Sequence, residues 1–465
     1  MSDHVIDAAE ASLGVAPGTV ARIKGPKDST ARVLSKLRRA RSKGSVEDGG
    51  VASDYSRSTE RMLAQVKYFL FVGMPSFDEA TGGFPGGRVS EVYGLDGCCK
   101  TALAMLASGS AKLIHQPDVN LKFKQGVYEK MDDGSFKPVT DADITVLFFD
   151  NEQSLDDGDR LKVNGEEVDA IIGECDTIDV MFKDIDTAIT ALEEVEAEIE
   201  KTTKIKRVQI LVVVVDTIAG TSTREEVKAE WAKVDYQRQP KQLRDGFRNM
   251  IRRIHARNVC MICNNQVSDS FKPPMPGQRK VRTFLPQDAD FSTFGGKALR
   301  YYASLRVFMV RVPSPYKLNR ASMFADGLQI HFFVSKNRQI APLRSGRLVL
   351  LFKGGLNASY TLLEQLCFLK LITYGGKGAI IIDFARHGVK IPALPVKSLE
   401  DQDVDGEAKF ELGSRSEWPA FMESHWPAVQ QLWAKGVRGM FDNNPVEADA
   451  EADEFDLDVT DPAAE

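Results

Sequence analysis

The chain has 465 residues, of which 43% are hydrophobic and 27% charged, a composition typical of a soluble protein with a large buried core. No apolar run approaches the roughly 20 residues that are needed to span a bilayer. The first residues also lack the basic-then-apolar pattern of a secretion signal. We therefore expect a cytoplasmic protein of two or three domains that has no membrane partner.

The net charge of −6 is unevenly distributed along the chain. Residues 446–465 contain nine acidic residues and no basic one, which leaves a net charge of +3 on the rest of the chain. This composition predicts a disordered tail. The tail could serve solubility alone, or it could mimic nucleic acid and compete for a basic groove.

A basic helix is predicted near the N-terminus, over residues 31–42, with Ser29 or Thr30 available to cap it. Three apolar residues, Val33, Leu34 and Leu37, are spaced to share one face of this helix, so the helix needs a partner surface. A polar linker follows at 43–58, and the core is expected to begin near Tyr68.

Two kinds of apolar run follow in the core. Continuously apolar runs, which predict strands covered on both faces, span 89–93, 145–150, 208–216 and 259–264. Helical stretches between them include 101–113 and 242–256. Later runs have no long helix between them and predict antiparallel strands at 305–312, 328–334 and 348–352.

The predicted fold class is therefore α/β with a mostly parallel sheet. We divide the chain into a small N-terminal helical segment (1–60), the sheet core (61–352), a C-terminal α+β domain (353–445) and the acidic tail (446–465).

Two segments, near 115–143 and 176–207, appear as insertions in this pattern. The first contains a hairpin signal around Gly134, and the second contains a charged helical stretch at 192–206.

A phosphate-binding loop follows the first apolar run. Its residues are Gly94, Leu95, Asp96, Gly97, Cys98, Cys99, Lys100 and Thr101, and Ala102 continues into a helix. They fit G-x-x-x-x-G-K-[ST] except that Cys99 replaces the last glycine. In such a loop the backbone N–H groups and the helix N-terminus bind the phosphates of ATP. Lys100 would reach the β and γ phosphates, and the Thr101 hydroxyl would bind Mg²⁺.

Two further strands end in carboxylates. Asp216 ends the run at 208–216, as the carboxylate near the Mg²⁺ ion does in phosphate-loop ATPases; a helix-capping aspartate is the alternative. The run at 145–150 ends in Asp150 and is followed closely by Glu152. Because the carboxyl ends of parallel strands meet at one sheet edge, either of these two residues could orient the attacking water.

From about residue 30 to the end, the chain resembles the RecA recombinase family, with the motifs in the family's order. The segments that carry the resemblance are 81–94, Asn265-Gln266, 295–304, Lys336-Asn337-Arg338 with Pro342, and 354–357. The basic N-terminal helix resembles the family's assembly helix, and the acidic tail resembles its C-terminal end. The resemblance implies a RecA-type phosphate-loop NTPase core that uses ATP and Mg²⁺.

The resemblance also implies roles at the ATP site. Glu152 matches the glutamate that polarises the attacking water, and Asp156 matches an aspartate that contacts adenine. Gln266 matches the γ-phosphate sensor that opens the second DNA-binding loop.

Three further residues match positions at the interface between subunits. Lys336 and Arg338 match cations supplied to a neighbour's ATP, where they stabilise charge on the transferred phosphoryl group. Phe352 matches an aromatic residue that stacks on the neighbour's adenine, although a core phenylalanine fits this position equally well.

DNA contacts are expected in two loops. The first spans about 221–242 and leads into a basic helix; its candidates are Tyr236, Lys241, Arg244 and Arg248. The second spans about 267–297; its candidates are Phe294, Gly295, Gly296 and Lys297, with Lys272, Arg279, Lys280 and Arg282 as further basic residues. Basic side chains with interleaved aromatic ones suit single-stranded DNA, because phosphates supply affinity and bases stack without sequence readout.

Two features depart from the family pattern. Cys99 adds a Cβ where glycine allows close approach of a phosphate, and Ser268-Asp269 stands where relatives often have a basic residue. The cysteine, the insertions and the long second loop resemble phage-encoded members of the UvsX group.

The sequence therefore predicts a DNA-dependent ATPase that forms a helical homo-oligomeric filament on single-stranded DNA and pairs it with double-stranded DNA. Single-strand-binding and mediator proteins are possible further partners. Two alternatives remain: a ring-forming helicase or motor on the same fold, and a DNA-binding scaffold whose phosphate loop no longer supports hydrolysis.

Overall fold

This computed structural model describes residues 66–113, 122–153, 155, 162–163, 166–167, 170–204, 208–224, 226, 238–269, 291–389 and 409–441. The expected N-terminal helix and the acidic tail lie outside the described residues.

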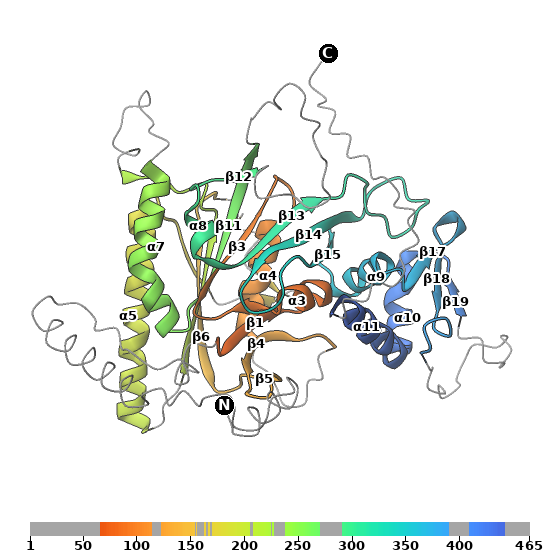
Figure 1. Ribbon diagram of the computed structural model, residues 1–465, viewed down its shortest axis with the longest axis horizontal. Coiled ribbons are helices and arrows are strands. Elements are labelled where there is room, and N and C mark those ends of the chain that lie inside the picture. The colour runs from red at the N-terminus through yellow and green to blue at the C-terminus, as the bar shows by residue number, and fades with distance from the viewer. Residues whose placement is uncertain are drawn as a thin grey trace, which may run out of the picture. The chain divides into compact units, whose positions relative to one another are not determined.

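A ten-stranded sheet forms the centre of the protein (Figure 1). Its order is β16-β15-β14-β13-β3-β11-β10-β6-β9, and β12 pairs with β11. The strands are β3 (Arg88–Gly94), β6 (Ala142–Asp150), β9 (Ile171–Gly173), β10 (Val208–Asp216), β11 (Cys260–Asp269), β12 (Phe291–Thr293), β13 (Ala303–Arg311), β14 (Gly327–Asn337), β15 (Ser345–Leu351) and β16 (Gly355–Leu356). The four apolar runs expected as parallel strands are β3, β6, β10 and β11, and they pair in parallel.

The sequence prediction was wrong about one partner of β13. This strand, expected to be antiparallel, pairs in parallel with β3, whereas β14, β15 and β16 add antiparallel pairs beyond it. The chain crosses from β11 over β3 before β13 begins, and the helix on this connection, α8 (Ala298–Tyr302), has only five residues. A helix this short leaves no periodic signal in the sequence.

Helices cover both faces of the sheet, which explains why its central strands are apolar throughout. On one face lie α3 (Pro75–Thr81) and α4 (Lys100–Lys112), and on the other lie α5 (Ile178–Thr203) and α7 (Arg238–Ala256), side by side in Figure 1. Alternate residues of β10 serve the two faces: Val212 and Val214 belong to the first buried cluster, Val213 and Val215 to the second.

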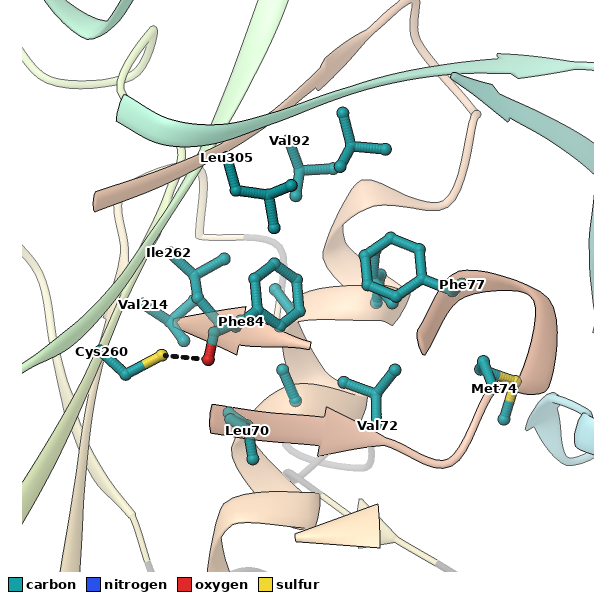
Figure 2. Close-up of a cluster of buried hydrophobic side chains, with 14 of the residues drawn as sticks. Leu70, Val72, Met74, Phe77, Phe84, Val92, Val214, Cys260, Ile262 and Leu305 are labelled. Atoms are coloured by element: carbon teal, nitrogen blue, oxygen red, sulfur yellow. Dashed lines mark hydrogen bonds between the residues drawn. The ribbon is translucent and has the colours of Figure 1, made fainter. Parts of the chain in front are cut away.

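Figure 2 shows part of the first cluster, where β1 (Tyr68–Val72) and β2 (Phe84–Pro85) pack under the sheet. Phe84 is fully buried against Phe77, with ring centroids 5.4 Å apart. The Cys260 thiol donates to the Phe84 carbonyl at 3.9 Å, which ties β11 to β2. Truncating a buried phenylalanine of this kind to alanine typically costs about 3–5 kcal/mol of stability.

A second sheet has the order β2-β1-β4-β5 and contains the expected hairpin. β4 (Gln125–Lys130) and β5 (Phe136–Pro138) are antiparallel around a turn at Gly134, so this prediction is confirmed. A two-stranded pair, β7 (Lys162–Val163) and β8 (Glu166–Glu167), lies nearby in sequence.

Residues 192–203 of the charged stretch expected at 192–206 form the end of α5 rather than a separate helix. It pairs with the end of α7: Arg253 donates to Glu193 at 3.3 Å, and Arg257, just after the helix, donates to Glu193 and Glu196 at 2.7 and 3.0 Å. These contacts neutralise one side of the basic helix α7.

The C-terminal part is a small α+β arrangement around its own buried cluster. Its elements are α9 (Ala358–Phe368), β17 (Ile372–Tyr374), η2 (Gly376–Gly378), β18 (Ile380–Asp383), β19 (Lys409–Leu412), η3 (Arg415–Glu417), α10 (Trp418–Ser424) and α11 (Trp426–Phe441). Helix α9 lies against β15, where Gln365 accepts from the Arg347 backbone N–H at 2.9 Å. The RecA-type α/β fold with a C-terminal α+β part is thus observed.

Candidate functional site

The phosphate-loop segment joins the end of β3 to the start of α4. Gly97 and Cys99 both have left-handed backbone conformations, with φ of 67° and 66°. Glycine adopts this conformation freely, whereas a residue with a Cβ is strained there by roughly 1–2 kcal/mol. Gly94 is required for a different reason, since a Cβ there would lie 2.1 Å from the Met309 carbonyl oxygen of β13. Cys99 therefore keeps the backbone shape that the missing glycine would give.

Lys100 is buried at the first position of α4. Its ammonium group donates to the carbonyl oxygens of Gly94 and Leu95 at 3.1 and 2.9 Å, and to the Cys98 sulfur at 3.7 Å. The cation thus lies inside the loop, where it can exchange carbonyl oxygens for phosphate oxygens.

Both cysteines of the loop are uncharged at neutral pH. Burial raises the pKa of the Cys98 thiol, and burial with the neighbouring Cys98 raises the pKa of Cys99 to about 12. A thiol adds bulk to the loop but no negative charge, so it does not repel phosphate electrostatically.

Asp216 is fully buried at the end of β10. Its Oδ1 accepts from Asn264 Nδ2 at 3.0 Å, and its Oδ2 has no hydrogen-bond partner in the part of the chain that the structure describes. Burial raises the pKa of this carboxyl, while the side chains of Thr101 and Asn264 partly offset the effect. A carboxylate oxygen without a donor, beside a threonine hydroxyl, fits the oxygen ligands that Mg²⁺ prefers.

Glu152 lies just beyond β6 and meets Gln266 of β11. Gln266 Nε2 and the Thr217 hydroxyl both donate to Glu152 Oε1 at 2.8 Å. Asp150, the other candidate for orienting the attacking water, is buried and accepts from the Leu155 backbone N–H at 3.0 Å. Glu152, which is exposed, is therefore the better placed of the two to reach a water molecule.

Strand register places the ends of four strands together. Gly94 lies opposite Gln266 in the β3–β11 pair, and Asp216 lies opposite Asp150 in the β10–β6 pair. Because β10 and β11 are also neighbours, the loop that begins at Gly94 and these polar residues share one sheet edge. Asp156, the expected adenine contact, lies outside the described residues.

The expected interface residues lie on β14 or just beyond β14 and β15. Lys336 is level with Arg306, in the middle of β13, and donates to the carbonyl oxygens of Arg300 and Tyr301 at 2.7 and 3.3 Å. Arg338 is exposed beyond β14, and Phe352 is 59% exposed beyond β15.

Helix α7 begins at Arg238, four residues earlier than expected, so Lys241 lies in the helix rather than in the first loop. Lys241, Arg244 and Arg248 are all exposed, and their spacing places them on one face. Tyr236 lies outside the described residues.

Phe294 lies at the C-terminal end of the second loop and is 41% exposed. Gly295 and Gly296 follow with φ of 74° and 63°, and Lys297 is exposed before α8. A Cβ on Gly295 would lie 2.3 Å from Leu243 of α7, so glycine lets the loop pass close to that helix. The basic residues expected within this loop, Lys272, Arg279, Lys280 and Arg282, lie outside the described residues, as do the side chains of Ser268 and Asp269.

Sequence reasoning gave no role to the two asparagines before Gln266, or to Thr217. Asn264 and Asn265 are fully buried, and each donates to a carboxylate. A signal was present, because consecutive carboxamides at the end of an apolar strand need buried partners.

Comparison with known proteins gives a consistent result. A family model described as the RecA N-terminal domain matches residues 143–357, a range that begins after the phosphate loop. RecA from Synechococcus sp. (strain CC9902) is 23% identical over 351 residues, which cover 75% of each chain. The chain is therefore similar to RecA proteins over about three quarters of its length.

Two further RecA proteins are similar to this chain to about the same extent. RecA from Acidothermus cellulolyticus is 24% identical over 332 residues, covering 71% of this chain and 76% of the relative. RecA from Helicobacter hepaticus is 24% identical over 342 residues, covering 72% and 81%. Among the described residues, no helix is both long and apolar enough to cross a membrane.

Proposed function

We propose that the protein is a DNA-dependent ATPase that assembles as a helical filament on single-stranded DNA and promotes strand exchange with a homologous duplex. It would act in recombination and repair, in the cytoplasm of a bacterial cell. The observation that carries the proposal is the bond between Gln266 and Glu152 at the edge where the phosphate loop begins. It links a strand that leads into the second loop to the carboxylate best placed for the attacking water.

ATP and Mg²⁺ fit the residues at this edge. Lys100, the backbone N–H groups of the loop and the N-terminus of α4 would bind the phosphates. Asp216 and Thr101 would hold the ion, since Asp216 has a buried oxygen that lacks a donor. The bound ion would supply positive charge that stabilises the transferred phosphoryl group.

Glu152 would orient water for attack on that group. Gln266 would sense the γ-phosphate, because a phosphate oxygen that accepts from the Gln266 amide would draw this amide away from Glu152. This movement would change the conformation at the start of the second loop. Lys336, Arg338 and Phe352 would act on the ATP of a neighbouring subunit, as the resemblance to the RecA family implies. We also propose a phage-encoded member of the UvsX group, on the basis of Cys99 and the two inserted segments.

DNA would contact the exposed basic face of α7 and the end of the second loop. Lys241, Arg244 and Arg248 would bind phosphates, which gives affinity that falls with salt concentration. Phe294 would stack on a base, and Gly295, Gly296 and Lys297 would meet the backbone.

The deciding experiment measures ATP turnover with and without single-stranded DNA, in the parent and in Glu152→Gln. We expect DNA to stimulate the parent, and the variant to lose turnover about a hundredfold or more while it still binds nucleotide. A parent with no DNA-stimulated turnover would instead favour the non-hydrolysing scaffold. Electron microscopy with single-stranded DNA and ATP then separates the remaining alternatives, because a recombinase forms long filaments and a ring helicase forms closed hexamers.

A further inference from the structure

Three consecutive carboxamides in the middle of β11 each donate to a different carboxylate. The pairs are Asn264 Nδ2 with Asp216 Oδ1 at 3.0 Å, Asn265 Nδ2 with Glu91 Oε1 at 3.0 Å, and Gln266 Nε2 with Glu152 Oε1 at 2.8 Å. Carboxylates only accept hydrogen bonds, so the nitrogen of each amide must face its partner. Two of these partners belong to the proposed ATP chemistry, whereas Glu91 does not.

Asn265 also holds the end of the second loop. Its Nδ2 donates to the Phe294 carbonyl oxygen at 3.0 Å, and the Phe294 N–H donates to the Gln266 carbonyl oxygen at 3.3 Å. Both backbone polar groups of Phe294 are therefore bound to two adjacent residues of β11. The loop that would contact DNA returns to the sheet at this point.

The other end of the Asn265 contact is rigid. Glu91 is fully buried in β3, and its Oε2 accepts from Arg306 Nε at 2.5 Å. The Arg306 guanidinium also lies 4.4 Å from the centre of the Tyr93 ring. Glu91 precedes Gly94, the first residue of the phosphate loop, by three positions on the same strand.

The loss of either hydrogen-bond acceptor of the Asn265 amide has an energetic cost. The amide's two N–H hydrogens serve Glu91, which is fully buried, and the Phe294 carbonyl, where the contact is partly buried. Its own Oδ1 is buried without a partner among the described residues, so a flipped amide would bring two acceptors together at Glu91. A displacement of Phe294 therefore has one of two results: Asn265 moves relative to β3, or a buried polar group of the Asn265 contact loses its partner. Leaving a buried polar group unpaired typically costs more free energy than the hydrogen bond itself contributes.

We propose that Asn265 is a positioning residue that couples the end of the second DNA loop to the strand carrying the phosphate loop. When DNA binds at Phe294, the Phe294 carbonyl group moves. The Asn265 amide transmits this movement to Glu91, and the resulting movement of β3 changes the position of the phosphate loop. This coupling acts beside the contact between Gln266 and Glu152, and it rests on the proposed function.

The test compares Asn265→Ala with Asn264→Ala. The two residues are adjacent, equally buried and each bound to one carboxylate, so they make a matched pair. We expect Asn265→Ala to lower the stimulation of ATP turnover by saturating single-stranded DNA about tenfold, within the usual range of coupling between sites, while basal turnover changes less than about threefold. Asn264→Ala should lower basal and stimulated turnover in equal proportion, because Asp216 loses its donor.

Equal stimulation in Asn265→Ala and the parent would overturn the inference, as would a proportional loss like that of Asn264→Ala. A parent that DNA does not stimulate would contradict the proposed function instead, so the two failures are distinguishable. Thermal unfolding of each variant establishes that it is folded at the assay temperature.

Hydrogen exchange on the unaltered protein gives a second test that needs no folded variant. A non-hydrolysable ATP analogue with Mg²⁺ should change the exchange of the amides of Phe294 and Gly295 as well as that of Gln266. A change at Gln266 alone would contradict coupling through Asn265.

Discussion

Two of the buried carboxylates, Glu364 and Asp216, differ in how many of their oxygens are paired. In the C-terminal part, Glu364 uses both oxygens: Oε1 accepts from Arg415 at 2.9 Å and from Tyr374 at 2.6 Å, and Oε2 accepts from Gln329 at 2.9 Å. At the sheet edge, Asp216 uses only Oδ1 among the described residues. Full pairing indicates a structural role for Glu364. A bare oxygen alone does not mark a ligand site, since Asp78 Oδ2 is also buried without a partner among the described residues, but that of Asp216 lies beside Thr101 at the proposed ATP site.

The charges around the two carboxylates also indicate a structural role for Glu364 and a ligand site at Asp216. Glu364 lies against the Arg415 guanidinium, which also packs over the rings of Tyr316 and Tyr374 at 4.7 and 4.8 Å. Burial raises the pKa of Asp216, and the neighbouring carboxylates of Glu152 and Asp150 raise it further. A bound divalent cation would relieve this repulsion, so the unfavourable charge arrangement is compatible with function.

Replacing Asp216 with asparagine should have the largest effect and separates the two roles. We expect Asp216→Asn to lower DNA-stimulated ATP turnover about a thousandfold, because the proposed Mg²⁺ site loses its charged ligand. The same change removes a buried charge, so without nucleotide the variant should be at least as stable as the parent at pH 7.

The pH dependence of that stability follows from the raised pKa of Asp216. The folded protein holds the Asp216 proton more tightly than the unfolded chain does, so this group's contribution to stability decreases as pH rises from the unfolded pKa through the folded one. Urea denaturation should therefore show the advantage of Asp216→Asn at pH 7 and its disappearance near pH 4. A variant less stable than the parent at pH 7 would mean that Asp216 is structural, like Glu364.

Removing Arg415 tests the structural side of the comparison. Arg415→Ala leaves Glu364 buried without its cation, and we expect it to lower the free energy of unfolding by about 3 kcal/mol. ATP turnover per folded molecule should stay unchanged. The matched control is Lys67→Ala, which breaks a solvent-exposed pair with Glu129 (N–O distance 3.0 Å) and should cost less than about 1 kcal/mol. Equal losses in the two variants, measured by urea denaturation, would refute the distinction.

Much of the sheet edge could be predicted from the sequence. Apolar strands that end in Asp216 and Asp150, together with the phosphate-loop pattern, place those residues at one edge by simple topology. The choice between Asp150 and Glu152 could not be made from position, because it depends on which carboxylate the backbone turns inward. The structure uses Asp150 to accept a backbone N–H and leaves Glu152 to meet Gln266.

The features that the sequence did not predict arise from contacts between distant segments. The parallel pairing of β13 depends on a crossing over β3, and the bond from Asn265 to Glu91 joins residues 174 positions apart. The helix start at Arg238 was also missed, because polar and basic residues in its first turn leave no apolar period. Local patterns carry information about strands and loops, whereas the pairing of buried polar groups is settled only when the chain folds.

The smallest expected effect concerns Cys99, which tests whether the ligand site tolerates a strained loop. Its φ of 66° favours glycine, but glycine also increases the entropy of the unfolded chain, and the two effects are of similar size, roughly 1 kcal/mol each. We therefore expect Cys99→Gly to change stability by no more than about 1 kcal/mol and to keep or raise the affinity for MgATP, measured by titration with a fluorescent ATP analogue. Cys99→Ala is the control, because it keeps the Cβ and removes the sulfur. If only the glycine variant binds more tightly, the backbone conformation limits binding; if both variants do, the bulk of the thiol limits it. A large loss of affinity in Cys99→Gly would contradict this interpretation, because it would mean that the cysteine itself shapes the phosphate site.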